Sequence, residues 1–395
     1  MVAERHRVVV LGAMAEMPVA GVVWQVLHYM EGLRRLGHDV AYVEDTGSWP
    51  YDPELDTITD DASPAAAWLG RVMENAGFGE SWGFVSAAHE DKTWGVTQKQ
   101  MRELLEHTDV LINLSGHTIL KPAHLEVPVR IYLETDPVTP QLEIAMGRQF
   151  TIDLLAAHTH HFSFGERLGL PGCAVPVERF NYRPTRQPVV LDWWRPPPSF
   201  PHPPPDGLRF TTVANWEQTY KDVVFAGETY TWSKSAEFLK LLEVPGRAGV
   251  TIDLALAVDD EETIALLLRS GFGVLPAAPL SRDPHAYRAF ITASGAEFTA
   301  AKDQNVRLRS GWFSDRTATY LATGRPAVVQ DTGFDTALPT GEGLLPFRTA
   351  DEAVDCLHRV ARDYERHSRA AHEIAIDHFR AETVLERLLS GAGIA

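Results

Sequence analysis

Blocks of apolar residues separated by polar turns predict alternating strands and helices in the first part of the chain. Arg7–Gly12 carries a continuous apolar run, which is typical of a buried parallel strand. After a loop at Ala13–Gly21, Gly37 predicts the end of a helix and His38–Asp45 predicts the next strand. The helix is indicated by apolar residues at helical spacing, namely Val22, Val26, Tyr29, Leu33 and Leu36. This order indicates one βαβ unit of an open parallel sheet.

The same alternation continues along the chain and then stops at a proline-rich segment. Met101–Thr108 predicts a helix, and Asp109–Leu114 and Pro128–Leu133 predict strands, whereas residues 48–95 are expected to form an irregular insertion. Pro184–Pro205 contains nine of the 26 prolines, so it cannot be a central strand or a helix interior. We interpret it as an extended spacer between two domains. A surface loop within one domain is the alternative.

Strand and helix signals resume after this segment and continue to the end of the chain. Strands are expected at Leu208–Val213, Val250–Leu256, Ala296–Thr299 and Pro326–Gln330. Helices are expected at Trp232–Leu242, Asp260–Ser270, Pro284–Ser294, Thr317–Thr323, Ala350–Tyr364 and Ser368–Leu389. The pattern therefore predicts two similar α/β domains, which also suits 395 residues, because one core rarely grows past about 250–300 residues.

Composition narrows the classes of partner and location. The net charge of -17 argues against non-specific nucleic-acid binding, which needs a basic surface. Cys173 and Cys356 are far apart and lack neighbours typical of metal or redox sites. The first residues lead directly into a strand without a leader-like apolar segment, and no run of about 18 apolar residues occurs. We therefore expect a cytoplasmic protein without a membrane span.

Several segments, Gly273–Ser294 among them, resemble glycosyltransferases of the GT-B fold, and these scattered matches extend over most of the chain. The others are LRRLGHDV (Leu33–Val40), SGWFSDRTATYLATGRPAVVQDTGF (Ser310–Phe334) and the C-terminal IAIDHFRAETVLERLLSGAGIA. The resemblance implies two Rossmann-like α/β domains whose parallel sheets face a cleft. Residues 1–200 would form the acceptor-side domain and 207–375 the donor-binding domain, with 376–395 returning to the first. The 48–95 insertion would face the acceptor.

The Ser310–Phe334 segment implies a site for the donor diphosphate. In the family, a glycine-containing loop and the start of the following helix hold this group. Free N–H groups and positive partial charge at a helix start suit phosphate on physical grounds alone. The candidate residues in and before this segment are Lys302, Arg309, Gly311, Ser314, Asp315, Arg316 and Thr317. A well-capped helix without a ligand is the alternative. Thr319 stands where retaining family members usually carry a glutamate.

Other loops that follow strands are expected to line the same cleft. The resemblance places the nucleobase along Gly273–Ser294. It places the donor sugar near Asp331, Thr332 and Gly333. An Asx-turn is the other interpretation of Asp331. Asn215, Trp216 and Lys221 follow the first strand of the second half and are further donor candidates. Trp216 is equally consistent with a core or lid position.

Three residues in the first half are candidates for a general base that deprotonates an acceptor hydroxyl. Asp136 and His117 follow strands and rank above Glu16, which is the ionisable residue of the first loop. A loop hydrogen bond is the alternative role for each. His158, His160 and His161 lack a carboxylate or cysteine partner at convincing spacing, so neither a metal nor a cofactor is expected.

The sequence therefore favours a metal-independent transfer of a sugar from a nucleotide-sugar donor to a small-molecule acceptor, with a natural-product aglycone as one candidate. Its partners would be these two substrates, without nucleic acid. Two alternatives stay open: a nucleotide-sugar epimerase or hydrolase of the same fold, and a non-catalytic binding protein of that fold.

Overall fold

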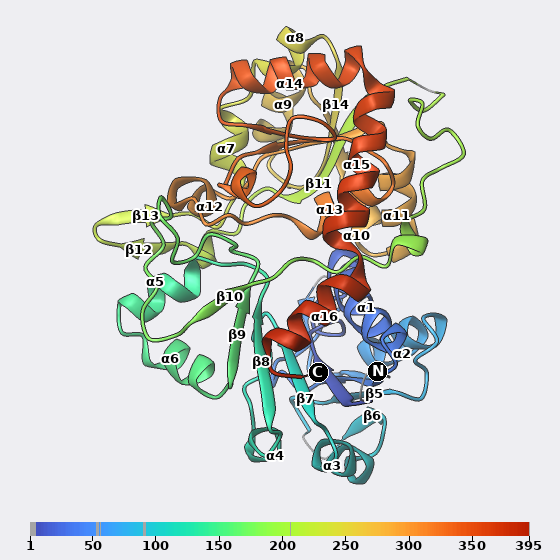
Figure 1. The fold of residues 1–395 in the computed structure, drawn as a ribbon, viewed down its shortest axis with the longest axis vertical. Helices are drawn as coiled ribbons and strands as arrows, with labels where there is room; N and C mark the ends of the chain where they lie inside the picture. The colour runs from blue at the N-terminus through green and yellow to red at the C-terminus, as the bar shows by residue number, and fades with distance from the viewer. Residues whose placement is uncertain (1–4, 53–54, 56, 90–91, 206, 395) are drawn as a thin grey trace.

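The computed structural model describes residues 5–52, 55, 57–89, 92–205 and 207–394. Two sheets, each covered by helices, lie one above the other in Figure 1, and the last two helices run across both. No helix among these residues combines the length and apolar character needed to cross a membrane.

The first domain is built on an eight-stranded sheet with the order β10-β9-β8-β7-β1-β2-β5-β6. Neighbouring strands run parallel except β5 and β6, which pair antiparallel. The strands are β1 (Arg7–Leu11), β2 (Asp39–Glu44), β5 (Trp82–Val85), β6 (Thr93–Gly95), β7 (Val110–Leu114), β8 (Val129–Glu134), β9 (His160–Ser163) and β10 (Tyr182–Pro184). The helices are α1 (Ala20–Arg35), α2 (Ser63–Asn75), α3 (Gln98–Glu106), α4 (Pro122–Leu125), α5 (Thr139–Ala145) and α6 (Gln149–Ala156).

The expectation of an irregular insertion at 48–95 is wrong. The segment contains α2, β5 and β6, and it extends the sheet beyond β2. A small hairpin of β3 (Tyr51–Asp52) and β4 (Thr57–Ile58) precedes them. None of its described residues lines the cavity between the domains. The short strands carry glycine and tryptophan rather than an alternating apolar pattern, which hid them from the sequence prediction.

The second domain is built on a six-stranded parallel sheet with the order β15-β14-β11-β16-β17-β18. Its strands are β11 (Arg209–Asn215), β14 (Thr251–Ala257), β15 (Gly273–Pro276), β16 (Ala296–Thr299), β17 (Ala327–Gln330) and β18 (Leu344–Phe347). Its helices are α7 (Ser235–Leu239), α8 (Val244–Ala248), α9 (Glu261–Arg269), α10 (Ala278–Ser281), α11 (Pro284–Ala293), α12 (Asp303–Leu308), α13 (Asp315–Ala322) and α14 (Ala350–Arg362). Short 3-10 turns, η2 (Thr219–Lys221) and η3 (Phe334–Thr336), follow β11 and β17. A hairpin of β12 (Val223–Phe225) and β13 (Glu228–Tyr230) lies outside both sheets.

The segment between the domains is extended, but it is packed against the protein rather than free. Its 3-10 turn η1 (Leu191–Trp194) places the Trp194 side chain in a core that joins both domains. The backbone of Val189 bonds to Phe379 and Ala381, where the C-terminal segment turns.

The expectation of one helix over Ser368–Leu389 is corrected by the structure. Two helices, α15 (Tyr364–Phe379) and α16 (Ala381–Gly391), meet at Arg380. Arg380 has φ -53 and ψ 123, so it is not helical. Leu385 and Leu388 of α16 pack in the core of the first domain with α1. The structure therefore confirms the two-domain α/β prediction while dividing its last helix.

Candidate functional site

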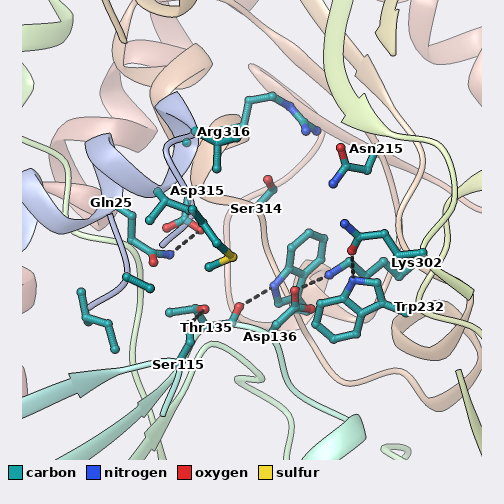
Figure 2. A pocket seen from close by; sticks show the side chains of 18 of the residues that line it. Gln25, Ser115, Thr135, Asp136, Asn215, Trp232, Lys302, Ser314, Asp315 and Arg316 are labelled. Atoms are coloured by element: carbon teal, nitrogen blue, oxygen red, sulfur yellow. Dashed lines mark hydrogen bonds and ion pairs between the residues drawn. The ribbon is translucent and has the colours of Figure 1, made fainter. Parts of the chain in front are cut away.

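A cavity of about 750 Å³ lies between the domains, at the carboxyl ends of both sheets. Residues that follow β1, β7 and β8 form one wall, and residues that follow β11 and β15 form the opposite wall. The carboxyl edge of an open α/β sheet is where such folds bind ligands. Figure 2 shows polar side chains from both domains pointing into this space.

An ion pair crosses the cavity between Asp136, which follows β8, and Lys302, which follows β16. Burial lowers the pKa of Lys302 to about 8, opposed by the nearby Asp136 carboxylate. The second carboxylate oxygen of Asp136, Oδ1, is buried and has no hydrogen-bond partner among the described residues. Asp136 therefore has one oxygen held by the lysine and one buried oxygen whose hydrogen-bonding capacity is unused.

Arg316 lines the cavity, but all three of its nitrogens are engaged within the second domain. Its Nε donates to Glu297 Oε1 at 2.7 Å, Nη1 to the Val213 carbonyl at 2.6 Å and Nη2 to Thr299 Oγ1 at 3.0 Å. The side chain of Glu297 is fully buried. The charge of Arg316 is therefore already matched by a carboxylate, which the sequence did not indicate.

Lys234 is the cation of this cavity that the sequence analysis missed. It lies at the start of α7 and is only 7% exposed. The hydrogen-bond partner of its Nζ is Thr299 Oγ1 at 3.5 Å, and no described carboxylate forms an ion pair with it. Burial, and then the charge of Arg316, lower the pKa of Lys234 well below its usual value. A buried amine without an acidic partner is costly unless a ligand supplies the negative charge.

The start of α13 opens onto the same space. Ser314 is the N-cap residue of this helix, and its side chain makes no capping hydrogen bond. Asp315 accepts a hydrogen bond from Gln25 Nε2 of α1 at 3.1 Å, as Figure 2 shows. Burial raises the pKa of Asp315 to about 7. An anionic ligand at this helix start would therefore meet a carboxyl group that is half protonated near neutral pH.

Further predicted residues are brought to the cavity wall. Asn215, Lys221 and His117 all line it. Burial, and then the charge of Lys221, lower the pKa of His117 to about 4, so this imidazole is neutral at pH 7. Glu134 at the end of β8 also faces the cavity, and burial raises its pKa to about 7.

Several candidates do not line the cavity and have other roles. Trp216 is 5% exposed and stacks on Phe238 in the core of the second domain. The Glu16 backbone N–H donates to Glu44 Oε1 at 2.6 Å, which fixes the first loop. Thr317 is fully buried within α13.

Five candidates in the loop after β17 and the loop before α13 do not line the cavity, although Trp312 and Ser314 of the second loop do. Asp331 accepts from Arg309 Nη1 at 3.2 Å and from Arg348 Nε at 2.8 Å. It also accepts from the Gly333 backbone at 2.7 Å, which is an Asx-turn. Thr332 donates its hydroxyl hydrogen bond to the Trp312 carbonyl at 2.6 Å. The remaining member, Gly311, has φ 77 and leaves no room for a side chain. These five residues therefore support the site from behind.

The histidines of the β9 region are engaged in local hydrogen bonds. His158 contacts Asn113 Nδ2 and the Leu154 carbonyl, and His161 contacts the Leu155 carbonyl. No cluster of three or more His, Cys, Asp or Glu side chains suited to a metal occurs in the part of the chain that the structure describes.

Comparison with known proteins bears on the fold. No family model matches the chain, and no curated protein matches its sequence. Among solved structures, AviGT4, a glycosyltransferase involved in avilamycin A biosynthesis, is similar with a TM-score of 0.55 and 13% identity, covering 98% of this chain and 97% of that chain. An α-glucosyltransferase solved with UDP and DNA has a TM-score of 0.57 and 11% identity, covering 99% and 100%.

Sucrose-phosphate synthase from Thermosynechococcus elongatus is similar with a TM-score of 0.54 and 12% identity, covering 98% of this chain and all of that one, 100%. All three comparisons span both domains, so they concern the relative placement of the two sheets as well as each sheet. Together with the cleft at the carboxyl ends of both sheets, they show that this chain has the fold of the GT-B glycosyltransferases.

Proposed function

We propose that this protein transfers a sugar from a nucleoside diphosphate sugar to an acceptor hydroxyl in the cavity between its domains. The observation that carries the proposal is Lys234, a buried amine without a carboxylate partner. It lies in the same cavity as the start of α13. A diphosphate between them would neutralise the amine and receive hydrogen bonds from the helix N–H groups.

The surroundings of this position suit the rest of a donor. Val213, Ala277, Ser281 and Tyr287 line the cavity in the second domain and would surround the nucleoside. The α-glucosyltransferase with a similar fold was solved in complex with UDP, which supports a uridine or related nucleotide as the first donor to test. Charge that develops on the leaving diphosphate would be stabilised by Lys234 and Lys302, so the proposal needs no metal.

Asp136 is the proposed base for a direct displacement. The acceptor oxygen would attack the anomeric carbon while the bond from that carbon to the diphosphate oxygen breaks, and the Asp136 carboxylate would take the acceptor proton. Its ion pair with Lys302 holds the carboxylate in the cavity. His117 is the second candidate, and its pKa of about 4 leaves the imidazole neutral and able to accept a proton at pH 7.

We propose a small molecule as the acceptor. AviGT4, which acts in the biosynthesis of avilamycin A, has a similar fold and supports this choice. The α-glucosyltransferase was solved with DNA, so the fold also serves nucleic acid. The net charge of -17 argues against that class here.

The test is a panel of nucleotide sugars, with thermal unfolding and product analysis measured on the same samples. A donor should raise the unfolding temperature, because a ligand of the native state stabilises it. Donor consumption that depends on an added acceptor supports transfer. Conversion without an acceptor would identify an epimerase or hydrolase, and the absence of any shift would identify a non-catalytic protein.

A further inference from the structure

The segment between β11 and α7 forms an arm that belongs to neither sheet. Its hairpin β12–β13 reaches the first domain, where Val223 packs with Val138 and Leu142. Figure 1 shows this arm between the two domains, beside α5 and α12. The base of the arm is fixed, because Asp303 Oδ2 accepts from the Thr231 backbone at 3.1 Å. The arm therefore contacts both domains and forms part of the cavity wall.

Lysines and aromatic rings alternate from this arm into the cavity. This lysine ladder comprises Tyr220, Lys221, Trp232, Lys302, Trp312 and Lys234. Lys221 Nζ lies 5.8 Å from the Tyr220 ring centroid and 4.6 Å from that of Trp232. Lys302 Nζ lies 3.2 Å from the Trp232 centroid and 5.9 Å from that of Trp312, and Lys234 Nζ lies 6.0 Å from Trp312. Aromatic faces stabilise nearby ammonium groups, so the ladder holds three cations close together.

The two ends of the ladder differ in exposure. Tyr220 is 78% exposed and lies at the rim of the cavity, whereas Lys234 is 7% exposed. Between them, the charge of Lys302 is matched by Asp136. Among the described residues, neither Lys221 nor Lys234 has a carboxylate partner, so positive charge is left unmatched at each end.

A nucleotide-sugar donor brings one diphosphate, which the buried end would hold. The positive charge of Lys221 at the rim would then still lack a partner, and a second anion would supply one. Asp136, the proposed base, lies between the two ends, where it forms an ion pair with Lys302. Lys302 and Lys221 both contact the Trp232 ring. An anion bound to Lys221 would therefore be separated from the Lys302–Asp136 pair by the Trp232 ring.

We infer that Lys221 binds an anionic group of the acceptor, a phosphate or a carboxylate, while the exposed ring of Tyr220 contacts the ring that carries it. This inference rests on the proposed function and names its acceptor class. Charge-assisted hydrogen bonds to an ammonium group are strong, and stacking on an exposed tyrosine adds contact area. Neutral acceptors of the same shape should bind weakly.

The test is calorimetric titration of the protein saturated with UDP. The probes are phenyl phosphate, benzoate and the neutral benzyl alcohol, so the first two distinguish the two kinds of anion. At least one anion should bind without displacing UDP, and benzyl alcohol should not. Lys221→Gln should weaken that anion by about tenfold or more and leave UDP affinity unchanged. Lys99→Gln is the matched control, because Lys99 is 81% exposed and outside the cavity.

Four results would overturn the inference: no binding of either anion, equal binding of benzyl alcohol, unchanged anion affinity in Lys221→Gln, or displacement of the anion by UDP. Loss of UDP binding in Lys221→Gln would assign Lys221 to the donor instead. The titrations are repeated without UDP. If UDP itself does not bind but anion binding still depends on Lys221, the proposed function fails and the anion site stands.

Discussion

At the scale of single residues, Lys234 is expected to lower the thermal stability of the unliganded protein and to raise its affinity for UDP. Lys234→Met replaces a buried amine that has no acidic partner, and whose pKa burial lowers, by an apolar side chain, so the unfolding temperature of the unliganded protein should rise. The same change should weaken UDP binding at least about tenfold and leave uridine binding nearly unchanged. Thermal unfolding and calorimetry measure the two effects.

Lys99→Met is the control for this variant, because it makes the same substitution on an exposed surface. A lower unfolding temperature together with equal loss of UDP and uridine would show that Lys234 has a structural role. The diphosphate would then lie elsewhere in the cavity.

Asp315 should make diphosphate binding depend on pH. Its pKa is raised to about 7 by burial, so it is mostly neutral below pH 7 and anionic above it. An ionised carboxyl at the start of α13 repels phosphate, and UDP affinity should fall as pH rises from 6 to 8. Asp315→Asn should bind UDP more tightly than wild type at pH 8 and show a smaller dependence. Because UDP also titrates, the informative quantity is the difference between the two proteins. Parallel pH profiles would remove Asp315 from the phosphate site.

Asp136 can be tested separately from donor binding. Asp136→Asn should reduce transfer by about a hundredfold to ten-thousandfold if the carboxylate is the base. UDP binding should be measured beside it, because the loss of the Asp136 carboxylate removes the charge that opposes the lowering of the Lys302 pKa. Turnover and UDP affinity are measured on the same preparation. Normal turnover in this variant, with loss of turnover in His117→Ala, would transfer the role to His117.

The residues of this cavity could be predicted only in part, because its charges are matched across distances that the sequence does not show. Lys302, Asp315 and Arg316 stood out beside a recognisable loop and helix. Glu297 of β16 neutralises Arg316 of α13, so the pair joins two separate elements. Lys234 was hidden by the hairpin, which separates it from β11 in the sequence.

At the scale of elements, the sequence periodicity located α1, but only the structure shows what α1 packs against. A side chain at Gly32 would clash with Leu385 and Ala381 of α16. Gly21, in the same helix, has no atom within 4 Å of the corresponding position. The helix pattern gave no sign of this difference, because contact with α16 depends on the break at Arg380.

These two glycines form a matched pair for testing the return of α16. Gly32→Ala should lower the free energy of unfolding, whereas Gly21→Ala should raise it by about 0.5–1 kcal/mol through helix propensity. Leu385→Ala alone should cost about 2–5 kcal/mol, because it leaves a cavity in the core. The double variant Gly32→Ala with Leu385→Ala should lose less than the sum, as the new methyl group occupies the vacated space. Urea unfolding measures all four proteins, and strict additivity would mean that the α1–α16 contact is looser than the structure shows.

At the scale of the whole molecule, the domains are joined by a core that contains a buried histidine. His28 of α1 lies among Trp24, Trp193 and Trp194. The Val190 backbone N–H and the Trp194 Nε1–H point at its two ring nitrogens, at 3.1 and 2.9 Å. Protonation would place an N–H group against a donor on both sides of the ring. Burial, and then the charge of Arg35, accordingly lower the pKa of His28 to about 3.

The pH dependence of stability should therefore reveal His28. Its folded pKa lies below the unfolded value of about 6.5, so its stabilising contribution is present above pH 6.5 and is lost as pH falls toward 3. One such group changes the free energy of unfolding by about 1.4 kcal/mol per pH unit in this window.

Other buried groups also make stability depend on pH. His117 and His158 act in the same direction as His28, whereas Glu44 and Glu134, whose pKa values are raised to about 7, act in the opposite one. The effect of His28 must therefore be isolated as a difference between proteins. Relative to wild type, His28→Gln should lose less stability between pH 6.5 and 4.5 in urea unfolding, while the exposed His107→Gln should follow the wild-type profile. Equal slopes in all three proteins would show that the core between the domains tolerates a charged imidazole.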